Sequence, residues 1–225
     1  MKIVVVGGGT SGWIVTHYLS STHHCINIST KEIPTIGVGE GTTGKFPDMI
    51  DVDKTKLMIE LDALPKLGIK FNGWSNTMDY FWSPIDGSGT ANYYIDYSTF
   101  SQYFTGALPS PCSRYSVLME HGKTNYSYDK DYLIGNWDHH ALHIDAYKTA
   151  EYFKKISLDS GAVHVEAQVV KVNREKNAIT SLELDDGSTV SGDVFIDCSG
   201  FSRVLNSHLD WIDYSEHLPV NSAVV

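Results

Sequence analysis

Three glycines near the start of the chain have the spacing of a phosphate-binding turn. Gly7, Gly9 and Gly12 follow the apolar run Lys2 to Val6 and directly precede an apolar helical pattern. Glycine at these places allows a tight turn, a close approach of the backbone to a pyrophosphate, and close packing of the helix on the strand. The free N–H groups of the helix N-terminus would then face the phosphates. The pattern predicts a dinucleotide-binding site.

Two later segments also carry closely spaced glycines. Residues 33–43 contain Gly37, Gly39 and Gly41, which favours a second close approach of the backbone to a flat or charged ligand. Far along the chain, Asp197-Cys198-Ser199-Gly200 follows a short apolar run. A dinucleotide laid across a parallel sheet touches both ends of such a chain, so we expect this late run to complete the sheet that begins at residue 2.

Hydropathy patterns predict the elements that would position these loops. The chain begins with a βαβ unit, in which strands 2–6 and 25–29 flank a helix over 11–20. Residues 75–135 show little periodicity and predict an insertion of short strands and loops near the substrate. The other expected elements are a helix over 54–64, a strand over 68–74, a helix over 145–158 capped by Asp145, a strand over 162–172, a hairpin with strands 179–184 and 188–190 around Asp185-Asp186-Gly187, and a strand over 194–197.

The end of the second strand departs from the usual nucleotide-binding pattern. That place normally holds an acid that binds a ribose hydroxyl, and here it holds Ser29 or Thr30. The nearest acid is Glu32, which stands 20 residues after Gly12. The sequence therefore predicts a weakened ribose contact.

Composition is compatible with a small-molecule enzyme. The 225 residues carry a net charge of -10, which disfavours nucleic acid and anionic membranes as partners. The 3 scattered cysteines fit reduced thiols in a cytoplasmic protein, and no apolar run reaches the ~20 residues of a membrane span. The apolar stretch 218–225 predicts a core strand, so we expect the chain to be the front part of a longer protein.

Several separate stretches together resemble the flavin-dependent, tryptophan-type halogenases of the FAD-dependent monooxygenase superfamily. The resemblance implies an α/β fold, with a Rossmann-like FAD-binding domain of the FAD-dependent monooxygenase type and a β-rich insertion. It stops before the family's Trp-x-Trp-x-Ile-Pro signature and its catalytic glutamate. The matching stretches are residues 7–13, 33–40, 66–74, 143–146 and 197–201.

The resemblance also implies a domain organisation. Residues 1–225 would form a single FAD-binding halogenase-type module. Within it, residues 1–74 and 140–225 would form the FAD-binding core, and residues 75–139 the insertion near the substrate.

The implied reaction has two sites. Reduced FAD from a separate flavin reductase, oxygen and a halide, chloride or bromide, give hypohalous acid, which passes to a lysine beside an electron-rich aromatic substrate. By the family's register Lys66 is that catalytic lysine and Lys70 its companion. A lysine suits the task because it donates hydrogen bonds to the departing oxygen, or acts as a nucleophile where burial lowers its pKa.

The same register implies the binding residues. Tyr80, Phe81 and Trp82 fall on the family's aromatic substrate wall, where a histidine usual in tryptophan-specific members is replaced by Trp82 or absent. This departure argues against free tryptophan as the substrate. The implied flavin contacts are Gly7, Gly8, Gly9, Thr10, Ser11, Gly12, Thr30, Ile33, Ile36, Val38, Glu40, Gly41, Val169, Asp197 and Gly200.

The residues leave other interpretations open. An FAD-dependent monooxygenase would share the glycine motifs without a use for Lys66, and a non-catalytic flavin-binding fragment would share them without turnover. An NAD-dependent dehydrogenase fits the second glycine loop less well. His139, His140 and His143 show no fourth ligand, so no metal site is expected. A homo-oligomer is left open.

Overall fold

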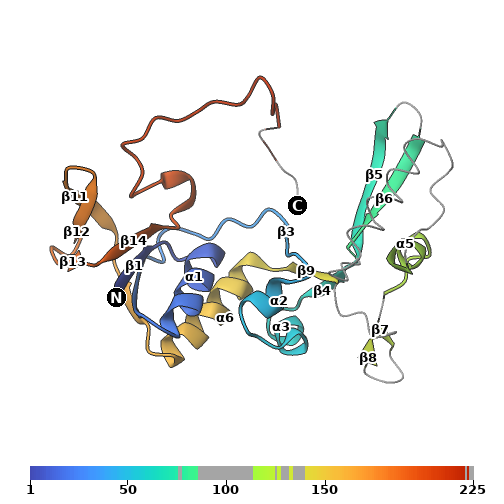
Figure 1. Cartoon of the computed structure of the whole chain (residues 1–225), viewed down its shortest axis with the longest axis horizontal. Coiled ribbons are helices and arrows are strands. Elements are labelled where there is room, and N and C mark those ends of the chain that lie inside the picture. The colour runs from blue at the N-terminus through green and yellow to red at the C-terminus, as the bar shows by residue number, and fades with distance from the viewer. Residues whose placement is uncertain are drawn as a thin grey trace. The chain divides into compact units, whose positions relative to one another are not determined.

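The computed structural model describes residues 1–75, 78–85, 114–124, 126–127, 132–133, 140–220 and 222. The chain divides into two compact units, one made of residues 1–40 and 145–225 and the other of residues 41–144 (Figure 1). This division does not test the predicted core and insertion, because compactness alone assigns no function. That domain assignment stays a prediction.

A four-stranded parallel sheet forms the centre of the first unit. Its strand order is β10-β2-β1-β14, and helices α1 and α6 pack side by side (Figure 1). The predicted βαβ start and the late strand that completes the sheet are both confirmed. The bounds are β1 (Lys2–Val6), α1 (Thr10–Ser20), β2 (His24–Ser29), α6 (Ala146–Asp159), β10 (Val163–Glu166) and β14 (Val194–Asp197).

The apolar run of β1 is buried on both faces of this sheet. Ile3 and Val5 pack in one cluster with residues of α1, and Val4 and Val6 pack in another with Leu182. Each such side chain contributes roughly 1.5–3 kcal/mol of burial free energy. This two-sided burial explains why the strand has a continuous apolar sequence rather than an alternating one.

An antiparallel sheet of three strands supplies that second cluster. Its members are β11 (Val169–Glu175), β12 (Ala178–Leu184) and β13 (Thr189–Ser191), and Gly187 in the predicted hairpin has a φ of +82°. The single strand expected over 162–172 is wrong, since its two halves belong to β10 and β11 in different sheets. The chain changes sheets where the Ala167 N–H donates to the Ser29 carbonyl and the Gln168 N–H donates to the Asp185 carboxylate.

The described residues from Glu40 to Ile144 include a small sheet of order β3-β9-β4 and the antiparallel pairs β5-β6 and β7-β8. The helix expected over 54–64 is too long, because Asp62 takes a φ of +48° and Leu64 already begins β4. Helix α5 lies in the segment that we expected to hold only strands and loops. The bounds are β3 (Glu40–Gly41), α2 (Phe46–Met49), α3 (Lys54–Glu60), β4 (Leu64–Lys66), β5 (Gly68–Ser75), β6 (Met78–Pro84), α5 (Arg114–Glu120), β7 (Tyr126–Ser127), β8 (Tyr132–Leu133) and β9 (Ala141–Ile144).

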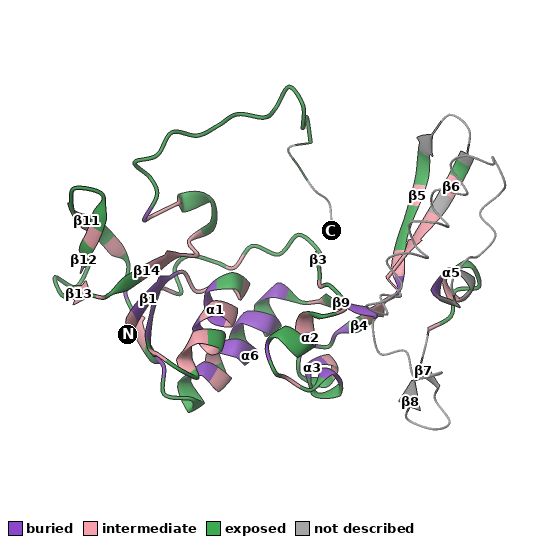
Figure 2. Ribbon diagram, in the orientation of Figure 1, coloured by how far each residue is buried: buried purple, intermediate pink, exposed green. Residues whose placement is uncertain are grey.

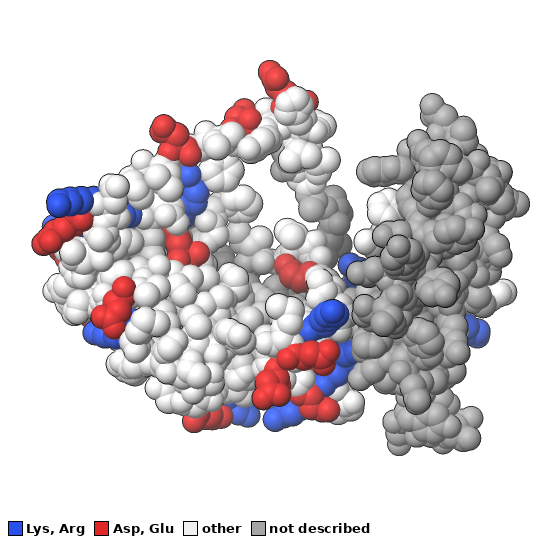
Figure 3. Space-filling model, in the orientation of Figure 1, with Lys and Arg blue, Asp and Glu red and all other residues white. Residues whose placement is uncertain are grey.

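The far end of the chain is exposed. Residues 206–220 have no buried member, and the strand expected over 218–225 is wrong for the described residues, which form no strand there (Figure 2). Leu218 and Val220 are 69% and 85% exposed, and the Leu218 N–H donates to the Tyr214 carbonyl in a local turn instead of pairing in a sheet. In the described part of the chain, no helix combines the length and apolarity that crossing a membrane requires. Acidic and basic side chains are interspersed on the described surface in view (Figure 3).

Candidate functional site

The glycine turn, residues 7–12, is shaped by close contacts of its backbone. A Cβ on Gly7 would lie 2.2 Å from the Cys198 carbonyl oxygen, and a Cβ on Gly12 would lie 2.0 Å from the Gly7 carbonyl oxygen. Both positions therefore require glycine. A Cβ on Gly9 would meet no described atom within 4 Å. The crowded side of the turn faces the sheet, and its open side is at Gly9.

The start of α1 fits a phosphate group. Its N-cap residue is Gly9, which has no side chain that could cap the helix, and the first turn carries no acidic residue. The Thr10 hydroxyl donates instead to the Ala146 carbonyl, at 3.0 Å. No carboxylate in the first turn therefore screens the positive end of the helix dipole, which the first N–H groups carry.

Asp197 joins the late motif to this turn. It pairs with Val6 at the end of β1, and its Oδ1 accepts hydrogen bonds from the backbone N–H and the hydroxyl of Ser199. Its Oδ2 accepts from the N–H groups of Leu205 and Asn206 and from the Asn206 amide. The carboxylate therefore holds residues 199–206 beside the glycine turn, rather than presenting a free acceptor to a ligand.

Asp197→Ala is expected to lower the free energy of unfolding by about 2–4 kcal/mol, because it removes one charged acceptor that serves several donors. Urea unfolding followed by circular dichroism measures the loss. Asp193→Ala is the matched control, since Asp193 is exposed and its carboxylate accepts a hydrogen bond from the Lys2 N–H. Equal stability of the two variants would contradict the anchoring role of Asp197.

The second glycine loop forms a strap, residues 33–41, with outward apolar side chains. Ile33, Ile36 and Val38 are 56%, 67% and 55% exposed. The Glu40 carboxylate accepts the Val38 N–H at 3.1 Å and so fixes the bend. Three exposed apolar side chains on one short loop are typical of a surface that a ligand or another segment covers.

Lys66 lies at the end of β4 and faces the last residue of the strap. A Cβ on Gly41 would lie 2.6 Å from the Lys66 Nζ, so the ammonium group occupies the space above this glycine. In the ladder of β4 with β9, Lys66 pairs with Ala141 and Leu64 pairs with His143, which places Lys66 and His143 on the same face. Burial, and to a lesser degree the Lys66 charge, lowers the pKa of His143. An ammonium group thus stands beside an imidazole that is neutral at pH 7.

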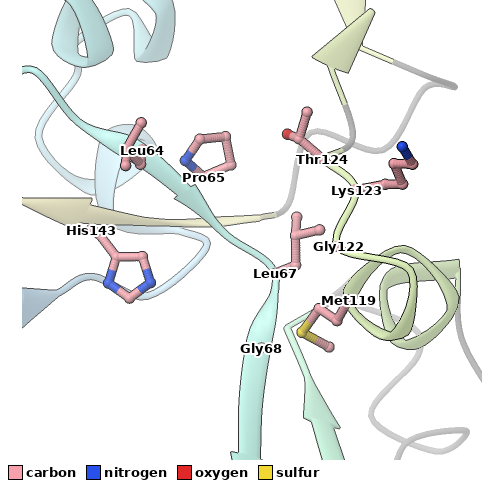
Figure 4. Close-up of a pocket in the computed structure, with 9 residues that line it drawn as sticks. All are labelled: Leu64, Pro65, Leu67, Gly68, Met119, Gly122, Lys123, Thr124 and His143. Carbon is pink, nitrogen blue, oxygen red and sulfur yellow. The ribbon is translucent and has the colours of Figure 1, made fainter.

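A pocket of about 610 Å³ lies along the same strand. Pro65 and Leu67, the two neighbours of Lys66, both line it, and His143 lines it from β9 (Figure 4). Its remaining wall comes mainly from α5 and the residues that follow it. Its lining mixes apolar side chains with the polar groups of Lys123, Thr124 and His143. The complete lining is Leu64, Pro65, Leu67, Gly68, Met119, Gly122, Lys123, Thr124 and His143.

Two of the predicted substrate residues belong to another cluster. The Tyr80 hydroxyl and the Trp82 indole N–H both donate to the Glu120 carboxylate, and the Lys70 Nζ lies 3.9 Å from the centre of the Tyr80 ring. These donors hold the Glu120 pKa below its ordinary value. The backbone of Phe81 pairs with Phe71. Glu120 escaped the sequence analysis because the segment around it carries no pattern, and the substrate role of these aromatics stays a prediction.

The remaining candidates divide between the described residues and the rest. Thr30 follows β2 and accepts the Glu32 N–H, Val169 opens β11, and Gly200 takes a φ of +62° at the start of a short 3-10 turn. His140 is buried, and His139 lies outside the described residues. Among the residues that the structure describes, no group of three or more His, Cys, Asp or Glu side chains could hold a metal ion.

Comparison with known proteins assigns nearly the whole chain to one family. The family model described as tryptophan halogenase matches residues 2–225. Tryptophan 6-halogenase ThaL of Streptomyces albogriseolus is 32% identical over 258 residues, which cover 99% of this chain and 47% of ThaL. Tryptophan 7-halogenase RebH of Lentzea aerocolonigenes is 28% identical, with the same two shares covered. The chain thus spans about half the length of these relatives.

Solved structures show the same fold. The tryptophan 6-halogenase SttH of Streptomyces toxytricini superposes with a TM-score of 0.81 at 24% identity, covering 97% of this chain and 48% of SttH. BrvH, a flavin-dependent halogenase from Brevundimonas sp. BAL3, superposes with a TM-score of 0.74 at 25% identity, covering 97% of this chain and 47% of BrvH. These neighbours confirm the predicted α/β fold class with a Rossmann-like parallel sheet.

Proposed function

Because this chain belongs to the tryptophan halogenase family, we propose that it forms the FAD-binding part of a flavin-dependent halogenase. The observation that carries the proposal is the position of the Lys66 ammonium group directly over Gly41, the last residue of the strap. A flavin held under the strap and a reactive lysine at its end are the two parts that a halogenation reaction needs. The glycine turn supports the first part, and the neutral His143 beside Lys66 supports the second.

The proposed cofactor fits the residues that are present. The pyrophosphate would bind on the open side of the turn formed by Gly7, Gly9 and Gly12. The apolar side chains of the strap would lie on the flavin ring. Asp197 would act through residues 199–206 and not by direct contact. When bound, reduced FAD would donate electrons to oxygen, and the partly reduced oxygen would then oxidise halide to hypohalous acid.

Lys66 would carry the second half of the reaction. Its Nζ donates hydrogen bonds, which polarise the bond between halogen and oxygen while an aromatic carbon attacks the halogen. Alternatively, its neutral amine attacks the halogen of hypohalous acid and releases water; the nitrogen–halogen bond then breaks as the aromatic carbon takes the halogen, and the ring proton returns to the amine. The neutral state of His143 favours the first of these roles, because a second cation there would repel the Lys66 ammonium.

The proposed partners follow from this chemistry. A separate flavin reductase would supply reduced FAD, and an electron-rich aromatic molecule would occupy the pocket of about 610 Å³ beside β4. The relatives are named for positions on tryptophan, which favours an indole-like ring. The Glu120 carboxylate accepts hydrogen bonds from Tyr80 and Trp82. We therefore propose that these two aromatics hold α5 against β6 beside the substrate.

Mass spectrometry of a bromide-containing reaction tests the function. The mixture contains the protein, FAD, a flavin reductase, NADH, and a set of indoles and phenols. A bromine isotope doublet that disappears when bromide is omitted supports halogenation. An added oxygen without dependence on halide would favour an FAD-dependent monooxygenase, and bound FAD with no product would favour a flavin-binding fragment.

Gly41→Ala is expected to lower halogenation at least about tenfold, equivalent to ~1.4 kcal/mol, with little loss of stability. The new Cβ would displace the Lys66 Nζ, which is the flexible end of a side chain, so the reactive group moves while the fold survives. Single-turnover product yield and melting temperature measure the two effects.

Gly37→Ala is the matched control for this variant. Its Cβ would meet only the Ala146 Cβ, at 3.4 Å, and the far Glu40 Oε2, at 3.8 Å, both in ordinary contact. We therefore expect it to leave the fold and the position of Lys66 unchanged, so that it measures the effect of an added methyl group on the strap alone. A Gly41→Ala protein as active as wild type would show that the position of Lys66 over Gly41 is unimportant.

A further inference from the structure

A run of buried polar side chains lies beneath the glycine turn. Asn27 in the middle of β2 is fully buried, and its Nδ2 donates to the Gly7 carbonyl and to the Thr16 Oγ1, each at 3.1 Å. The Thr16 hydroxyl, also fully buried, donates in turn to the Gly12 carbonyl at 2.7 Å. Both carbonyls that Asn27 and Thr16 hold belong to glycines of the turn.

The same run continues away from the turn to the edge of the sheet. The Ser29 hydroxyl donates to the Asn27 Oδ1 at 3.0 Å, and the Ser29 Oγ lies 3.0 Å from the His164 Nε2 on β10. Asn27 and His164 are register partners in the parallel pair of β2 and β10. The Trp13 ring packs edge-on against the His164 ring, at 5.2 Å between centres.

Counting protons along this run fixes its direction. Asn27 uses both N–H groups on Gly7 and Thr16, so its Oδ1 needs a donor, and the single proton of the Ser29 hydroxyl meets that need. The Ser29 Oγ must then accept from His164, which places a proton on the imidazole Nε2. Burial, and secondarily the charge of Lys154, lowers the pKa of His164, which is consistent with a neutral ring.

We propose that Asn27, Ser29 and His164 form a hydrogen-bond relay that orients the glycine turn toward a pyrophosphate, with His164 as its outermost positioning residue. Asn27 holds the Gly7 carbonyl toward β2, and Thr16, which Asn27 bonds, holds the Gly12 carbonyl along α1, so that the N–H groups at the start of α1 face the open side. A turn held in this way loses less conformational freedom when the phosphates bind.

The relay also explains why the end of β2 carries Ser29 and not the usual acid. In place of a carboxylate for the ribose, the chain carries Ser29, and a Cβ on Gly8 would lie 2.7 Å from the Ser29 Cβ. Ser29 therefore packs directly under the turn. At this position Ser29 supports the glycine turn, where an acid would contact the ligand directly. The inference rests on the proposed function only in taking the pyrophosphate of FAD as the ligand.

Titrations with FAD and with ADP test the relay, because ADP carries the pyrophosphate without the flavin. His164→Phe keeps an aromatic ring beside Trp13 but removes the donor, and we expect both ligands to bind about fivefold to tenfold more weakly. His164→Gln retains an N–H donor and is expected to restore most of the affinity. Val165→Ala, a core change on the same strand, is the control that should leave both dissociation constants unchanged.

Nitrogen-15 NMR of the wild-type protein gives a second readout that needs no substitution. We expect the His164 imidazole to be neutral at pH 7 with its proton on Nε2. A proton on Nδ1 alone would reverse the relay and overturn the inference. Unchanged FAD and ADP affinities in His164→Phe would overturn it as well.

These measurements separate the relay from the proposed function. Neither the titrations nor the NMR experiment involves halide or turnover. A protein that shows the expected affinities and tautomer but never halogenates would support the relay and contradict the halogenase assignment. Halogenation with unchanged affinities in His164→Phe would do the opposite.

Discussion

Lys66→Ala is expected to lower halogenation by about 10²–10³-fold or more while FAD still binds. The Lys66 Nζ is the cationic donor that lies over the end of the strap, and alanine leaves no group there to polarise or receive the halogen. FAD affinity is retained because the glycine turn and the late motif belong to the other compact unit of the chain. Product yield under bromide and the dissociation constant of FAD are the two measurements.

Lys66→Arg separates the two chemical roles of the lysine. Arginine keeps the charge and the hydrogen-bond donors, but it stays protonated and cannot act as an amine nucleophile. Substantial activity in Lys66→Arg would therefore favour polarisation by hydrogen bonding, and its absence would favour a halogen carried on nitrogen. Lys56→Ala on the exposed side of α3 is the matched control for loss of a lysine. Full activity in Lys66→Ala would contradict the assignment of this residue.

The parts of the fold that the sequence predicted best are those in which short-range pattern and packing agree. The bounds expected for the strands 2–6 and 194–197 match β1 and β14, because both strands pair inside the parallel sheet and carry continuous apolar runs. The hairpin at Gly187 was equally accessible, since its turn residues favour one backbone geometry. The strand over 162–172 failed because a change of sheet at Ala167 depends on Ser29, which is far away in the sequence.

The site shows the same division. The glycine turn could be predicted because its backbone leaves no room for a side chain, and that restriction is visible as glycine in the sequence itself. The relay could not, since Ser29 and His164 are 135 residues apart and neither position has an unusual residue type for a strand. Glu120 was hidden for a similar reason, because it meets Tyr80 only when α5 packs on β6.

Gly12→Ala is expected to remove measurable FAD binding and to lower the free energy of unfolding by about 1–3 kcal/mol. Its Cβ would lie 2.0 Å from the Gly7 carbonyl oxygen, an atom that cannot retreat easily because the Asn27 amide holds it. The turn must open, and the N–H groups at the start of α1 lose their common direction. Urea unfolding and flavin fluorescence titration measure the two losses.

Gly9→Ala tests whether the ligand approaches from the open side of the turn. A Cβ on Gly9 would meet no described atom within 4 Å, so stability should stay close to that of the wild type, unlike that of Gly12→Ala. The same Cβ would stand where the pyrophosphate is expected, and FAD affinity should therefore fall. The two substitutions would then differ in their effect: Gly12→Ala would disturb the fold of the turn, and Gly9→Ala would obstruct only the ligand. Wild-type FAD affinity in Gly9→Ala would place the phosphates elsewhere.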